Sequence, residues 1–357
     1  MAIRQGVAAA VAMAMTVFSL AAVGQAGEET RFKGVTLRVA TWGGATRDAL
    51  RDYVASELER RGAKVEFVIG SPQDNLAKLI AARGQVPFDV VEFIGTMRPE
   101  IEGRALLAKL DPARVPNAKG LRFEPPSDLM VPTWITEEMI VYNKDLFRQN
   151  GIAPPKSLAD LRNAKLAGRI MIPDISSGGG IEAVGAFALT AGGNEGNITP
   201  GLKLINDLPG VRFWKAGGEV VTQFKSGDIW VAIAHAGWAL RTARAGVPVA
   251  TVPAQIGSHQ GMVKEGYIGV VKGTTNQEAA EFFINTYLSP VAQEKFALKV
   301  GVVPVVQTAR AKMSEDPTLR DLVILEPAKI NNMVRLDAAK IDLGKWNDEW
   351  NRSVAAR

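Results

Sequence analysis

The sequence predicts an α/β fold in two domains, each a mainly parallel sheet flanked by helices. Strands and helices alternate between residues 37 and 110, an order typical of a doubly wound parallel sheet. The segment before about residue 168 does not follow this pattern, and the alternation of strands and helices begins again there. A length of 357 residues also suits two domains of ordinary size.

The first strand and the first helix meet at a glycine turn that contains a tryptophan. Residues 37–40 are typical of a strand, the turn follows at Trp42, Gly43 and Gly44, and a helix should begin at about Thr46. Such a junction faces a ligand crevice in open α/β sheets, because free helix N–H groups and bare backbone point into it. Trp42 and Gly43 are therefore candidate ligand contacts, although the ring could instead pack the helix against the sheet.

Two more strand ends should lie beside this turn. Residues 64–69 form the next strand, and Ser71 is predicted to cap a helix that ends at Gly84. A third strand covers residues 87–93 and a helix follows over about 97–110. Ser71, Glu92 and Phe93 become candidates for the cleft; Glu92 could equally be a solvated or capping carboxylate.

The second domain should present its own strand ends. We expect crossings between the domains at about 134–142 and 252–266. In between, the loop with Ser176, Ser177 and Gly178 precedes a helix, and a buried strand over 229–234 runs into His235 and Trp238. The glycines could merely make a tight turn, and His235 could be a hydrogen-bonded core residue.

The ends of the chain are predicted to have other roles. Residues 1–26 have the layout of a signal peptide with cleavage near Ala26, giving an exported soluble protein; an uncleaved membrane anchor is the alternative. The tail from 330 to 357 should be largely helical, with Trp346 and Trp350 as packing anchors on one face.

Composition excludes several classes of function. The net charge of +5 comes from interspersed charges without a long basic run, so we predict no nucleic-acid partner. The chain has no cysteine and only two histidines, His235 and His259, which argues against a metal site. A hydrolase could use these histidines with a serine, but the sequence has no Gly-x-Ser-x-Gly elbow.

Taken in order, these features resemble a periplasmic solute-binding protein of an ABC transporter. The similarity is to the spermidine/putrescine-binding branch and its iron, thiamine and phosphonate relatives. The segments that carry it are 40–44, 87–91, 141–147, 158–161, 168–174, 224–228, 267–270 and 289–293.

The resemblance implies a type II periplasmic-binding-protein fold with two lobes joined by crossover strands. Lobe 1 would comprise residues 35–136 and 266–310, lobe 2 residues 137–253, and a helical segment over 311–357 would pack on both. The protein would be a monomer without cofactor or enzymatic activity. It would close on a solute and deliver it to an inner-membrane permease, although a periplasmic ligand sensor is the alternative.

The resemblance also suggests what the cleft holds. Polyamine binders of this branch use aromatic rings and carboxylates, but Gly266 stands where the branch has an acid, with Glu265 one residue away. The glycine loop would favour a carboxylate or phosphate, and no adjacent tyrosine pair is present for iron. We therefore expect a polyamine-like or zwitterionic amine, with a phosphonate, carboxylate or thiamine-like solute as the alternative. The candidate ligand-binding residues are Trp42, Gly43, Ser71, Glu92, Phe93, Trp134, Ser176, Ser177, Gly178, His235, Trp238, Glu265 and Tyr267.

Overall fold

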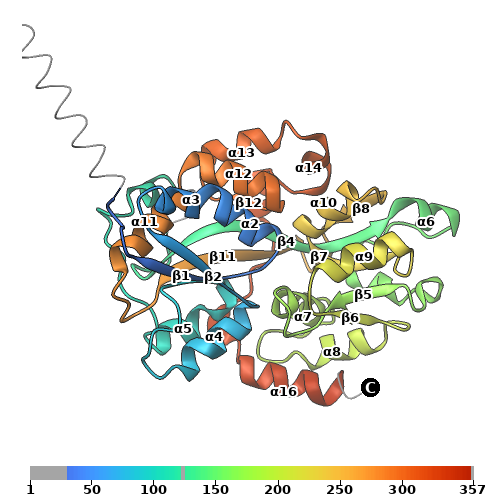
Figure 1. Cartoon of the computed structure of the whole chain (residues 1–357). Helices are drawn as coiled ribbons and strands as arrows, with labels where there is room; N and C mark the ends of the chain where they lie inside the picture. The colour runs from blue at the N-terminus through green and yellow to red at the C-terminus, as the bar shows by residue number, and fades with distance from the viewer. Residues whose placement is uncertain (1–29, 122–124, 355–357) are drawn as a thin grey trace, which may run out of the picture.

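A computed structural model describes residues 30–121 and 125–354 and confirms the α/β class (Figure 1). One sheet, in the order β2-β1-β3-β11-β4-β7-β5-β6, runs through the molecule, and β8 and β12 also pair with β4. The predicted signal peptide lies outside the described residues. None of the helices described is both long and apolar enough to cross a membrane.

The first half of the sheet is parallel. β1 (Thr36–Thr41) lies between β2 (Lys64–Ile69) and β3 (Val90–Ile94), so the ends of all three strands meet at one edge. Ser71 caps the helix after β2 through a reciprocal pair of hydrogen bonds with Asp74, as predicted. The helices of this half are α2 (Ala45–Leu50), which continues through a π-helical turn into α3 (Ser56–Glu59), then α4 (Pro72–Ala81), α5 (Arg98–Gly103), α11 (Gln277–Tyr287) and α12 (Pro290–Val300).

Two long antiparallel strands occupy the middle of the sheet. β4 (Met130–Asn143) is buried along its whole length and pairs with β11 (Met262–Val270). β11 pairs on its other side with β3, and the far end of β4 pairs with β7. These two strands therefore connect the parallel strands of the first half with those of the second, as Figure 1 shows.

The second half repeats the parallel arrangement. β5 (Ile170–Pro173) lies between β7 (Val231–His235) and β6 (Arg212–Trp214), and β8 (Val249–Val252) pairs with β4. Its helices are α6 (Lys144–Gln149), α7 (Gly180–Thr190), α8 (Thr199–Asn206), α9 (Gly218–Ser226) and α10 (Ala236–Arg244). A small hairpin of β9 (Gln255–Ile256) and β10 (His259–Gln260) precedes β11.

The C-terminal part of the chain packs on both halves. β12 (Val303–Pro304) pairs with β4, and α13 (Gln307–Met313), α14 (Pro317–Leu322), α15 (Pro327–Asn331) and α16 (Leu343–Ser353) follow. Trp346 and Trp350 are each 1% exposed, and Trp346 Nε1 donates to the carbonyl oxygen of Glu195 at 2.9 Å. Both tryptophans are confirmed as packing anchors.

Two sequence-based predictions of helix length are wrong. The helix expected to reach residue 110 ends at Gly103, because Ala105 adopts a left-handed φ of 50° and turns the chain toward a bridge between Leu107 and Val271. The tail is less helical than expected, because an irregular segment with only a short 3-10 turn (Ala338–Lys340) separates α15 from α16. The proposed boundaries of the two lobes stay a prediction.

Candidate functional site

A cavity of about 470 Å³ lies where the strand ends of the two halves face each other. Trp42 and Ser71 enter it from the first half, His235 and Trp238 from the second, and Lys264 from β11 between them. The lining residues are Trp42, Gly43, Gly44, Ala45, Thr46, Ile69, Gly70, Ser71, Trp134, Thr136, Gly178, Trp214, Lys215, Ala216, Gly217, Gly218, His235, Trp238, Arg241, Lys264, Phe296, Val300 and Val302.

On the side of the first half, the aromatic wall consists of two tryptophans. The rings of Trp42 and Trp134 meet edge to face with their centroids 5.5 Å apart. The ring of Trp134 lies across Gly266, where a Cβ atom would come within 2.1 Å of its Cε2. A side chain at position 266 would therefore displace the tryptophan from this place.

The facing wall is built around Trp238. Its ring lies against Gly217, where a Cβ atom would be 1.9 Å from Trp238 Cε2. The guanidinium carbon of Arg241 sits 3.9 Å from the ring centroid, a cation–π contact that orients both side chains. Burial lowers the pKa of Arg241 to about 10, so it remains charged at neutral pH.

His235 is a neutral hydrogen-bond donor at the end of β7. Its Nδ1 accepts the backbone N–H of Gly237 at 3.1 Å. Burial, with the nearby charges of Lys264 and Arg241, holds the pKa of His235 well below its ordinary value. The proton of the neutral ring therefore sits on Nε2, which can donate to an acceptor in the cavity.

Positive charge dominates this cavity. Lys264 is 5% exposed, and its Nζ donates to Glu138 Oε1 at 3.3 Å beneath the cavity. Burial raises the pKa of Glu138 to about 7, despite the opposing effect of Lys264. Among the described residues that line the cavity there are Lys215, Arg241 and Lys264 but no aspartate or glutamate. The arrangement suits a ligand that carries a negative charge and an apolar or cationic body.

Direct contacts also join the two halves, and two of them lie outside the lining of this cavity. Gln73 Nε2 of α4 donates to the carbonyl oxygen of Ser177 at 3.0 Å, and Thr96 Oγ1 donates to Glu182 Oε1 at 3.2 Å. The backbone at Gly178 approaches Trp42 so closely that a Cβ atom there would lie 3.1 Å from Trp42 Nε1. The two halves are therefore in direct contact beside the cavity.

The thirteen candidate residues divide into two groups. Seven of them line this cavity, namely Trp42, Gly43, Ser71, Trp134, Gly178, His235 and Trp238. The side chain of Ser71 is engaged in the cap of α4, so it offers the cavity little free hydrogen-bonding capacity. Their contact with a solute stays a prediction.

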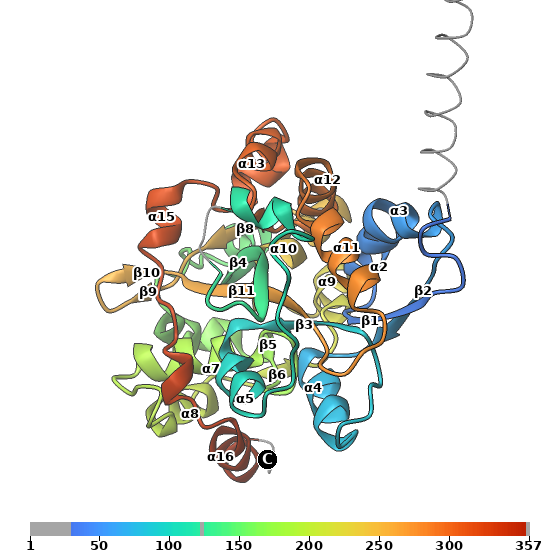
Figure 2. The ribbon, with the colours of Figure 1, turned by 90° about the vertical axis from the view of Figure 1, so that its left-hand side faces the viewer.

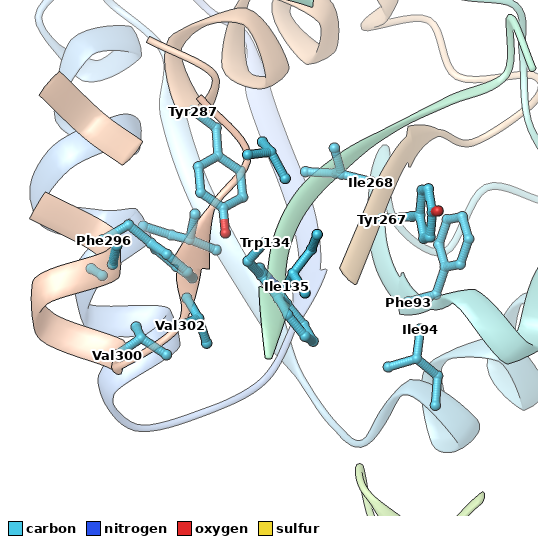
Figure 3. Close-up of a cluster of buried hydrophobic side chains, with 14 of the residues drawn as sticks. Phe93, Ile94, Trp134, Ile135, Tyr267, Ile268, Tyr287, Phe296, Val300 and Val302 are labelled. Atoms are coloured by element: carbon cyan, nitrogen blue, oxygen red, sulfur yellow. The ribbon is translucent and has the colours of Figure 1, made fainter. Parts of the chain in front are cut away.

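Six candidates lie elsewhere. Glu92 is 1% exposed and accepts a hydrogen bond from Thr41 in the core of the first half, where burial raises its pKa to about 7. Phe93 and Tyr267 stack on each other with centroids 6.1 Å apart, away from Trp134 (Figure 3). Their strands deliver these side chains into packed layers instead of the cavity.

The other three of these six make their contacts outside the cavity. The Ser176 hydroxyl is exposed and donates to Asp174 at 2.6 Å. Ser177 is buried, and only its carbonyl oxygen reaches across to Gln73. Glu265 accepts from Arg335 Nε at 3.2 Å on the opposite face of β11 from Lys264. None of these three residues lines the cavity.

Sequence reasoning missed the cationic residues of the cavity. Lys264 follows from strand alternation, since it precedes Glu265 and must point to the opposite face. Arg241 lies three residues after Trp238 on α10, a spacing that places both side chains on one helix face. No comparable sequence pattern could have placed Trp214 and Lys215, at the end of β6, in the cavity.

Comparisons with known proteins find similarity to solute-binding proteins. A family model described as bacterial extracellular solute-binding protein matches residues 54–321. A γ-aminobutyric acid-binding protein of Pseudomonas aeruginosa is 26% identical over 342 residues, which cover 90% of this chain and 91% of that protein.

Solved structures share the fold. A structure described as a GABA receptor is 25% identical with a TM-score of 0.70, covering 88% of this chain and 94% of its own. A putative spermidine/putrescine ABC transporter protein from Listeria monocytogenes has a TM-score of 0.74 at 19% identity, covering 90% of this chain and 99% of its own.

Proposed function

Because the chain belongs to the family of bacterial extracellular solute-binding proteins, we propose that it captures a small zwitterionic amino acid for an ABC importer. The solute class is a short ω-amino acid resembling γ-aminobutyric acid, with a carboxylate at one end and an ammonium group at the other. The observation that carries this proposal is a tryptophan-lined cavity with basic side chains and no acidic one among its described lining residues.

The carboxylate of such a solute has several partners in the cavity. Lys264 and Arg241 supply positive charge, and the Nε2–H of His235 can donate a neutral hydrogen bond. Charge-assisted hydrogen bonds of this kind contribute about 1.5–3 kcal/mol. A diamine would place a second cation beside these groups, which favours the zwitterionic alternative over a polyamine.

The remainder of the solute fits the aromatic walls. Trp42, Trp134 and Trp238 can cover methylene groups and attract an ammonium group through their ring faces. A cavity of about 470 Å³ holds a small amino acid together with water. The γ-aminobutyric acid-binding relative supports the same solute class.

Capture and delivery would follow from closure. A solute that touches Trp42 on one half and Trp238 on the other stabilises the closed arrangement by its additional contacts there. We propose that lobe 1 (residues 35–136 and 266–310) and lobe 2 (residues 137–253) are the moving bodies. The protein would be exported to the periplasm as a monomer, and its closed, solute-bound form would dock on the permease.

Isothermal titration calorimetry of the protein would test the solute class. The panel is γ-aminobutyric acid, butyrate, butylamine and putrescine, which vary the two charged ends on one carbon chain. We expect γ-aminobutyric acid to bind most tightly and butyrate to bind better than butylamine. Tighter binding of putrescine than of γ-aminobutyric acid would contradict the proposal.

A further inference from the structure

A second cavity, of about 430 Å³, lies on the opposite face of β11. Val263 and Glu265 line it, whereas Lys264 between them lines the first cavity. Successive side chains of a strand point to opposite faces, so β11 separates two differently lined chambers. The proposed function uses only the first of them.

Three separate parts of the chain enclose this second cavity. Thr96 and Glu102 come from the segment that ends in α5, and Glu182 comes from α7 in the second half. The third wall is the segment 335–339 between α15 and α16. Figure 2 shows this segment passing beside α5 on its way to α16. A molecule in the cavity would therefore contact both halves and the C-terminal segment.

Carboxylates outnumber cationic groups in the lining. The acids are Glu102, Glu182, Glu265 and Asp337, and the bases are Arg98 and Arg335. Two of the acids have ion-pair partners, because Arg335 Nε lies 3.2 Å from Glu265 Oε1 and Lys340 Nζ lies 3.0 Å from Asp337 Oδ2. These pairs leave the region around Glu182 acidic.

Glu182 is the side chain that points to a ligand. It is 2% exposed and lines the cavity, and its Oε1 accepts a hydrogen bond from Thr96 Oγ1 at 3.2 Å. Its Oε2 is buried and has no hydrogen-bond partner among the described residues. A buried carboxylate oxygen without a donor is costly, and a ligand that supplies N–H groups would remove that cost.

We propose that this cavity binds a small organic ammonium ion whose N–H groups donate to Glu182. A metal ion is a poorer fit, since the described part of the chain has no group of three or more His, Asp or Glu side chains that could hold one. An anion would meet the unpartnered oxygen of Glu182 directly. The site is distinct from the solute site in the first cavity, and its existence does not rest on the proposed function.

The charges packed around Glu182 set the expected affinity. Burial raises the pKa of Glu182, whereas Lys264 in the neighbouring chamber opposes that rise by attracting the carboxylate, and Glu138 repels it. An ammonium ion must therefore compete with the field of Lys264, and Arg98 in the same wall adds repulsion. We expect binding in the millimolar range, with the ligand acting to hold the closed arrangement together.

Calorimetry with n-propylammonium chloride would test the site, with tetramethylammonium chloride as a probe of equal charge and no N–H donor. The wild type should bind propylammonium at least tenfold more tightly than tetramethylammonium. Glu182→Gln should weaken propylammonium binding at least tenfold. The matched control Glu315→Gln, at an exposed acid outside the cavity, should leave it within twofold.

Two further variants separate this site from the first cavity. Ala339→Phe fills the second cavity from an exposed position and should abolish propylammonium binding even if the Glu182 variant proves unstable. Trp42→Ala alters only the first cavity and should leave the affinity within twofold. Unchanged binding in the Glu182 and Ala339 variants, or a loss in the Trp42 variant, would overturn the proposal. Failure of γ-aminobutyric acid to bind would leave it unaffected.

Discussion

Lys264 and Glu138 should have opposite effects on the affinity for a carboxylate solute. Lys264→Met removes the ammonium group closest to the centre of the sheet while keeping an apolar stem of similar length. Loss of one charge-assisted hydrogen bond of about 1.5–3 kcal/mol corresponds to roughly 10- to 150-fold weaker binding. Glu138→Gln keeps the shape of the partner but removes its negative charge.

The distances around Lys264 predict how much the Glu138→Gln substitution should raise the affinity for the solute. Glu138 Oε1 lies 3.3 Å from Lys264 Nζ, so a solute carboxylate on the far side of the ammonium would be about 6–7 Å from Glu138. At an effective dielectric constant of about 20–40, the repulsion at that separation is about 1–3 kcal/mol. The variant should therefore bind γ-aminobutyric acid several-fold more tightly than the wild type does.

Titration calorimetry at several pH values is the appropriate assay. The pKa of Glu138 in the folded protein is about 7, so the carboxyl ionises as the pH rises from 6 to 8 and competes for Lys264. Affinity in the wild type should fall over that interval, and Glu138→Gln should remove the fall. Because loss of one partner of a buried pair destabilises the fold, the double variant Lys264→Met/Glu138→Gln serves as the folding control.

Unchanged affinity in a folded Lys264→Met protein would refute this reasoning. The same conclusion would follow if Glu138→Gln bound the solute more weakly than the wild type, since the repulsion argument allows only the opposite sign. Circular dichroism melting of all three variants would show whether each one is folded at the temperature of the titration.

Three other expectations concern different parts of the molecule. Trp42→Ala should weaken solute binding by roughly 1–3 kcal/mol in calorimetry; equal affinity in a folded variant would remove Trp42 from the site. Gly178→Val should press on Trp42, whose Nε1 is already 3.1 Å from a Cβ built at that position, and should reduce the ligand-induced compaction seen by small-angle scattering; compaction equal to that of the wild type would contradict this. Burial raises the pKa of Glu137 from 4.5 to about 8, so the folded state holds that proton more tightly and the free energy of unfolding should fall as the pH rises from about 5 to 8. Urea unfolding should show this fall reduced by a few kcal/mol in Glu137→Gln; an identical pH profile would argue against it.

Much of the fold was accessible from local patterns. The capping box at Ser71, the strand–turn–helix junction at Trp42 and the anchor pair Trp346 and Trp350 each depend on residues within a few positions of one another. The resemblance to solute-binding proteins of ABC transporters is confirmed by the family match. The order of these segments along the chain was therefore sufficient to predict the family. It also led to seven candidate residues that line one cavity.

The six candidates that do not line the cavity show what local patterns leave out. A strand end predicts the edge of a sheet but not the direction of each side chain, and that direction depends on register. Glu92 and Phe93 lie on the predicted strand, but pairing of β3 with β1 and β11 places it inside the sheet, where side chains on both faces are buried. The pairing with β11 joins residues about 175 positions apart, and nothing in either segment alone specifies it.

The alternation of side chains along β11 matters most for the proposed function. The sequence directs attention to Glu265, because the related binders place an acid nearby, but alternation assigns that carboxylate to the second cavity and gives Lys264 to the first. Gly266 in turn makes room for the ring of Trp134. Positions 264 and 266 thus give one face of this central strand a cation and the ring of Trp134 that packs over Gly266. These features support the proposed carboxylate-bearing solute.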